Sequence, residues 1–124
     1  MSKNIKASAT IAETTRFVLP NDTNTLGNLM GGNLLSWLDI NAAIAAHRFC
    51  KRVVVTASVN HVAFEKSIKL GQIVTIVSKV SRSFNSSMEV YSDVYVEDSA
   101  TGKKQKCNEA IYTLFEGVAG VEEI

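Results

Sequence analysis

The feature that most constrains the fold is a long apolar segment that begins at a pair of glycines. From Gly32 to about Phe49 nearly every position is apolar or small, and Asp39 is the one acid in the segment. This pattern predicts a helix that is buried on most of its sides. Such a helix needs a sheet curled around it, and a second copy of the chain to cover what remains exposed.

Asp39 is the first candidate for chemistry. A carboxylate in so apolar a helix costs free energy unless it is paired, hydrogen-bonded or facing a solvated cleft. Ser36, Asp39 and Ala43 share one helix face, where the small side chains leave room for a ligand or a partner chain. The residues also leave a structural alternative open, in which Asp39 pairs with an arginine or caps a neighbouring element.

The start of the predicted helix offers a second chemical group. The backbone N–H groups near Gly31 to Asn33 have no partner within the helix, so they can bind a developing oxyanion. The glycine pair lets a substrate approach the backbone closely. Together with Asp39 as a base, these donors form a plausible acyl-hydrolysis site, in which Asn24 could orient the water or the carbonyl. Asn21 to Asn24 follow Pro20, however, and such clusters are also ordinary turn formers.

The remaining pattern predicts strands. Alternating or β-branched segments lie at 5–17, 53–64, 72–82, 88–97 and 104–116. Most connections between them have hairpin length, which predicts an antiparallel sheet covered by one helix, in the α+β class. The chain has 124 residues and no internal repeat or linker. We therefore expect a single domain over 1–124.

Composition sets limits on partners. The net charge of +1 favours neither a nucleic acid nor a membrane as partner. Cys50 and Cys107 make no disulfide framework, which favours a reducing, cytoplasmic setting. His47 and Cys50 have the spacing of a metal-ligand pair, but no second close pair follows, so we expect no metal site. The sequence also lacks a glycine-rich phosphate loop.

The motifs PNDTNTLGNLMGG, LLSWLD, AAIAAHRFC and VVTASVNHVAF resemble those of the hotdog-fold acyl-CoA thioesterases, in particular the bacterial and cytosolic acyl-CoA hydrolases. The resemblance extends over about 16–115. It implies a hotdog fold, in which an antiparallel sheet of five or six strands wraps a central helix. It also implies a homodimer at least, more specifically a hexamer built as a trimer of dimers, with the active site at the dimer interface.

The resemblance also implies roles for individual residues. Asp39 would act as general base or nucleophile, and Asn24 of one subunit would work with Asp39 of the other. The N–H of Gly32 would polarise the thioester carbonyl. Coenzyme A would enter only as part of the substrate, with no separate cofactor. The candidate substrate-binding residues are Gly31, Arg82, Asn85, Ser86 and Ser87, of which the last three resemble the segment that contacts coenzyme A in relatives.

Two other functions compete with acyl-CoA hydrolysis. A hotdog dehydratase acting on 3-hydroxyacyl thioesters would need a histidine beside the helix acid, and His61 is too weakly placed in its strand to support that role. A non-catalytic acyl-CoA-binding module would not need Asn24 and Asp39 together. The chain also departs from its relatives at Asn60, where they usually have an acid, and at Ala63.

Overall fold

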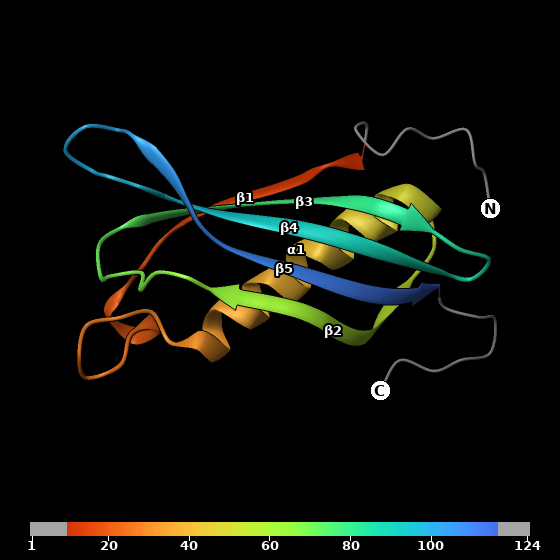
Figure 1. The fold of residues 1–124 in the computed structure, drawn as a ribbon, viewed down its shortest axis with the longest axis horizontal. Helices are drawn as coiled ribbons and strands as arrows, with labels where there is room; N and C mark the ends of the chain where they lie inside the picture. The colour runs from red at the N-terminus through yellow and green to blue at the C-terminus, as the bar shows by residue number, and fades with distance from the viewer. Residues whose placement is uncertain (1–9, 117–124) are drawn as a thin grey trace.

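The computed structural model describes residues 10–116, which form one long helix and five strands (Figure 1). The elements are β1 (Ala12–Phe17), a short 3-10 turn (Pro20–Asp22), α1 (Gly31–Cys50), β2 (Val54–Phe64), β3 (Ile73–Ser83), β4 (Ser87–Glu97) and β5 (Lys104–Glu116). The predicted elements are therefore confirmed, and most of their ends agree with the predicted ranges to within one residue. The first strand begins at Ala12, and residues 5–9 of its predicted range lie outside the described residues. The helix begins one residue earlier, at Gly31.

The five strands form one antiparallel sheet in the order β1-β3-β4-β5-β2. Hairpins join β3 to β4 and β4 to β5, and the two edges are β1 and β2. This arrangement confirms the α+β class. No helix in the described range is long and apolar enough to cross a membrane.

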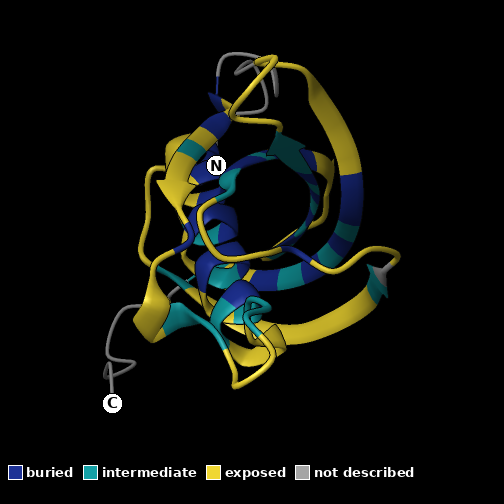
Figure 2. Ribbon diagram, turned by 90° about the vertical axis from the view of Figure 1, so that its left-hand side faces the viewer, coloured by how far each residue is buried: buried dark blue, intermediate teal, exposed yellow. Residues whose placement is uncertain are grey.

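The core lies between α1 and the concave face of the sheet. The end-on view in Figure 2 shows the sheet curling around the helix, with the buried segments toward the middle. The helix contributes buried side chains such as Leu38 and Ala42, which pack with buried strand residues such as Val90 and Leu114. The opposite side of α1 stays exposed within one chain: Ile40 is 56% exposed and Ile44 is 38% exposed. A single chain therefore buries one side of the helix and leaves an apolar side uncovered.

A buried amide ties the middle of α1 to the sheet. Asn41 is 1% exposed, and its Nδ2 donates to Ala12 O (3.0 Å), to Ile76 O (3.3 Å) and to Ser78 Oγ (2.8 Å). Its Oδ1 accepts from the Thr14 hydroxyl at 2.7 Å. Every polar atom of this side chain is thus satisfied by β1 or β3. The geometry fixes both the rotation of α1 about its axis and its position along the strands.

We predict that Asn41→Ala destabilises the fold strongly. The change leaves buried hydroxyl and carbonyl groups on β1 and β3 without partners, which costs about 3 kcal/mol of unfolding free energy. Denaturant unfolding followed by circular dichroism measures the effect. Lys79→Ala, at an exposed position on β3, serves as the control and should change stability by less than about 0.5 kcal/mol. A loss for Asn41→Ala no larger than that of the control would contradict the anchoring role.

Candidate active site

Asp39 lies on α1 beside the edge strand β2, where it meets a single hydroxyl. The Thr56 Oγ1 donates to Asp39 Oδ1 at 2.5 Å. Asp39 is half-buried, and no cation of residues 10–116 pairs with it. The structural alternative of an arginine partner is therefore wrong within the described chain. A carboxylate can accept about four hydrogen bonds, so Asp39 keeps acceptor capacity for a water or a ligand.

An irregularity in β2 places Thr56 and Val59 on the same face of the sheet. The register of β2 against β5 shifts between Thr56 and Ser58 and again between Val59 and His61. As a result, Thr56 lies opposite Leu114 and Val59 lies opposite Tyr112, both of which are buried against the helix. Regular alternation would place positions 56 and 59 on opposite faces. The shift between Thr56 and Ser58 instead turns both side chains toward α1, a common use of bulges beside functional sites.

These residues line an open cleft of about 470 Å³. Its walls come from the first turns of α1, from β2 and from β5: Gly32, Leu35, Ser36, Asp39, Thr56, Val59 and Tyr112. Tyr112 is 1% exposed, and its hydroxyl donates to Leu35 O at 3.1 Å. Burial raises the pKa of the Tyr112 phenol to about 12, and the nearby Asp39 carboxylate adds to the rise. Tyr112 therefore stays neutral at physiological pH and forms a fixed wall of the cleft.

The start of α1 provides free donors at the same cleft. Met30 is the N-cap residue, and no side chain caps the helix. Asn33 N and Leu34 N donate to Met30 O, but no acceptor in the described chain meets the N–H of Gly31 or Gly32. Apart from the neighbouring residues and the backbone of the helix itself, no atom of the described chain lies within 4 Å of a Cβ built on either glycine. The space in front of these two residues is open to a ligand or to another chain.

Asn24 does not line the cleft that contains Asp39. Its Oδ1 accepts from the N–H groups of Leu26 (2.9 Å) and Asn28 (3.2 Å). Gly27, with a φ of +78°, completes this turn in a conformation that favours glycine. The turn-forming interpretation of the 21–24 segment is therefore confirmed. Any contact between Asn24 and Asp39 would have to be made between subunits or after a movement of the loop.

The other candidate residues lie elsewhere. Gly31 lines a neighbouring cleft of about 280 Å³ on the other side of the helix start. Arg82, Asn85, Ser86 and Ser87 belong to the β3–β4 hairpin, at the opposite end of the sheet from the start of α1 (Figure 1). One chain therefore brings Gly32 and Asp39 together at one cleft, but not the hairpin residues.

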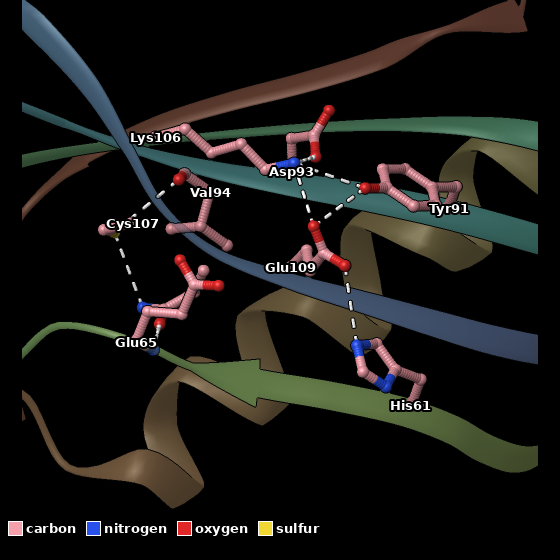
Figure 3. Close-up of polar contacts among 9 residues, drawn as sticks. His61, Glu65, Tyr91, Asp93, Val94, Lys106, Cys107 and Glu109 are labelled. Atoms are coloured by element: carbon pink, nitrogen blue, oxygen red, sulfur yellow. Dashed lines mark hydrogen bonds and ion pairs between the residues drawn. The ribbon is translucent and has the colours of Figure 1, made fainter.

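His61 faces away from the Asp39 cleft. It belongs to a polar cluster on the outer face of the sheet, shown in Figure 3, where its Nε2 lies 3.5 Å from Glu109 Oε2. Lys106 Nζ sits 2.9 Å from both Asp93 Oδ1 and Glu109 Oε1, and the Tyr91 hydroxyl donates to Glu109. The Lys106 ammonium lowers the pKa of Glu109 below its ordinary value. These charges satisfy one another, and no histidine of the described chain is placed to assist Asp39 as a dehydratase would require.

Comparison with known proteins identifies the family. The model of the thioesterase superfamily matches residues 26–103, which include α1, β2, β3 and β4. The chain belongs to the thioesterase superfamily. Its helix and curled sheet are the hotdog fold, as the solved relatives also show.

Several relatives of this thioesterase-superfamily chain are named for acyl-CoA hydrolysis. Mouse acyl-coenzyme A thioesterase 11 is 40% identical over 105 residues, which cover 85% of this chain but 18% of the mouse protein. The acyl-CoA hydrolase of Staphylococcus aureus, solved with butyryl coenzyme A and coenzyme A, is 34% identical, with a TM-score of 0.86 over 89% of this chain and 67% of that one. Variants of that enzyme with an Asp, an Asn or a Thr replaced by alanine have also been solved. A hexameric acyl-CoA thioesterase is 32% identical, with a TM-score of 0.89 over 96% of this chain and 77% of that one.

Sequence reasoning missed two residues of the cleft. Thr56 stands in a strand where a β-branched residue needs no special explanation, and the face that it shares with Val59 depends on the register shift in β2. In the sequence, Tyr112 has the pattern of an ordinary buried aromatic residue of a strand. No pattern in a single sequence predicts either bulge. The one sequence feature that pointed to this part of the site was the VVTASVNHVAF motif as a whole.

Proposed function

We propose that this chain hydrolyses acyl-CoA thioesters to a carboxylic acid and coenzyme A. The observation that carries the proposal is the pairing, at one cleft, of an acid without a cation partner with free N–H donors at a helix start. Thioester hydrolysis needs these two functions, because a base must activate water and donors must stabilise the oxyanion. The names of the relatives support the same activity.

In this proposal the Asp39 carboxylate removes a proton from the attacking water, or attacks the thioester carbonyl itself. The Gly32 N–H donates to the carbonyl oxygen as it gains charge, and the helix dipole favours that charge. The Thr56 hydroxyl holds the carboxylate in place. The Asn, Asp and Thr replaced in the Staphylococcus aureus enzyme have the same spacing along the chain as Asn24, Asp39 and Thr56, which supports these assignments.

We infer that the working unit is a homodimer at least, and a hexamer by analogy with the hexameric relative. The edge strand β2 carries exposed apolar side chains, with Val55 39% and Val59 46% exposed, and α1 leaves Ile40 and Ile44 uncovered. Pairing two β2 edges about a twofold axis would cover both surfaces. An antiparallel pairing would also carry the partner's β3–β4 hairpin, with Arg82 and Asn85, toward the end of the sheet where α1 begins.

Asp39→Asn should abolish most of the thioesterase activity. The variant keeps the shape of the side chain and the Thr56 contact but loses the base, which lowers turnover by about 10²–10⁴-fold. The measurement is release of free thiol from acetyl-, hexanoyl- and palmitoyl-CoA, with thermal unfolding to show that the fold is kept. Near wild-type turnover in the variant would mean that Asp39 is structural. A wild-type chain that binds these compounds without releasing thiol would instead be a binding module.

Gly32→Ala should separate folding from catalysis. Alanine favours a helix over glycine by about 1 kcal/mol, and the chain itself leaves room for the methyl group, so stability should hold or rise. The methyl group would occupy the space through which the thioester carbonyl reaches the N–H, so turnover should fall at least about tenfold. Gly31→Ala is the matched comparison, because it adds the same methyl group one residue away, beside the other cleft. Equal activity in both variants would exclude Gly32 as the oxyanion donor.

Mixing two inactive variants should restore activity if the site is shared between subunits. Random dimers of Asn24→Ala with Asp39→Ala chains are about half mixed, and twofold symmetry gives each mixed dimer one intact site. Co-expressed chains carrying two different tags should therefore recover about one quarter of wild-type activity. Each variant expressed alone provides the baseline. If doubly tagged dimers form but stay inactive, both residues act within one chain, and a species of 13.5 kDa in light scattering would rule out the dimer itself.

A further inference from the structure

The cleft at the tip of the β4–β5 hairpin is lined by three lysines that have no ion-pair partner among the described residues. This cleft, of about 430 Å³, lies between the hairpin and the loop that joins β2 to β3. Three lysines line it: Lys66 from the loop, and Lys103 and Lys104 from the hairpin. No ammonium group of these three has an ion pair or hydrogen bond among the described residues. This differs from Lys106, two residues further on, which is held by Asp93 and Glu109.

Acids near the cleft offset part of this charge but do not pair with the lysines. Asp98 is the one acid in its lining, and its Oδ1 accepts from the N–H groups of Ala100 and Thr101 in the hairpin turn. Glu97 is the register partner of Lys104 across the hairpin, but the two make no ion pair within 4 Å. Glu65 precedes Lys66 and lines the neighbouring cleft instead. With three lysines against the one carboxylate of Asp98, the lining keeps an excess of positive charge, and such a cleft attracts anions.

Neutral donors complete the lining. Ser67, Gln72 and Gln105 face the same cleft. Gln72 uses its Oε1 to accept from Lys69 N, which leaves its amide nitrogen available as a donor. At the base lies the buried thiol of Cys107, whose Sγ contacts Val94 O. Three ammonium groups with several amide and hydroxyl donors form a site that suits a group bearing more than one negative oxygen, rather than a single carboxylate.

We propose that this cleft binds a phosphate-bearing ligand, with Lys66, Lys103 and Lys104 as its cationic donors. Its volume is in the range of small-molecule sites. The cleft shares Lys66 and Ser67 with the smaller cleft that Gly31 lines at the start of α1. The two clefts therefore adjoin each other at these residues. Two ligands could supply the phosphate group. One is the nucleotide part of a coenzyme A thioester, an assignment that rests on the proposed function, and the other is a separate nucleotide.

The direct test is a calorimetric titration of the full chain with inorganic pyrophosphate in low salt. The wild type should bind, and Lys103→Gln/Lys104→Gln should bind at least about tenfold more weakly, because two charge-assisted contacts are lost. Lys66→Gln should weaken binding as well. Lys79→Gln/Arg52→Gln removes the same two charges outside the cleft and should bind as the wild type does. Thermal unfolding checks that each variant is folded.

Absence of pyrophosphate binding by the wild type would overturn the proposal. So would equal weakening by the control pair, because the effect would then come from net charge alone. These outcomes do not depend on catalysis, so they are distinct from a failure to release thiol from acyl-CoA. The kinetic arm identifies the source. If Lys103→Gln/Lys104→Gln raises the KM for acyl-CoA but not for acyl-pantetheine, which lacks the nucleotide, the cleft binds the substrate. If the same variant binds ADP more weakly with an unchanged KM for acyl-CoA, the cleft binds a separate nucleotide.

Discussion

The position of α1 on the sheet depends on one buried side chain. Apolar contacts hold the helix against the concave face, but such contacts are non-directional and tolerate small rotations and slips. The Asn41 amide is directional, because its four hydrogen bonds reach β1 and β3 at fixed points. Ser78, one of its partners, is in turn bonded to Ser92 on β4 at 2.6 Å. A polar chain thus runs from the helix across two strands, and any slip of α1 would leave several of its members unsatisfied.

The orientation of Asp39 follows from this anchoring. Asp39 is two residues before Asn41, so the two side chains project about 200° apart around the helix. When Asn41 points into the core, Asp39 must point toward the far side, where β2 forms the edge of the sheet. The same constraint leaves Ile40 and Ile44 uncovered. The reactive group and the uncovered apolar surface are therefore two consequences of one buried amide.

The sequence predicts the parts of this arrangement that have a local physical cause. An isolated charge in an apolar helix singles out Asp39, and unpaired N–H groups at any helix start single out Gly31 and Gly32. The strands are predicted because alternation and β-branched residues have a period of their own. Asn41 could not be singled out in this way, because an asparagine in a helix has no characteristic pattern and its partners are distant in sequence. The shared face of Thr56 and Val59 depends on the register shift between Thr56 and Ser58, whose position is set by the packing of β2 against β5, not by the residues of β2 alone.

Charged side chains on the outer face of the sheet and at the tip of the β4–β5 hairpin differ in whether they are paired. On the outer face, Lys106 is held between Asp93 and Glu109, and the pKa of Lys106 is raised by these contacts, so that this part of the surface is electrically satisfied. At the hairpin tip, Lys103 and Lys104 make no ion pair among the described residues, although Glu97 is the register partner of Lys104 across the hairpin. Asp98 directs its Oδ1 to the N–H groups of Ala100 and Thr101 in the turn. Its charge offsets part of the lysine charge, but the ammonium groups keep their hydrogen-bonding positions for a ligand, and this distinguishes the cleft from the paired outer face.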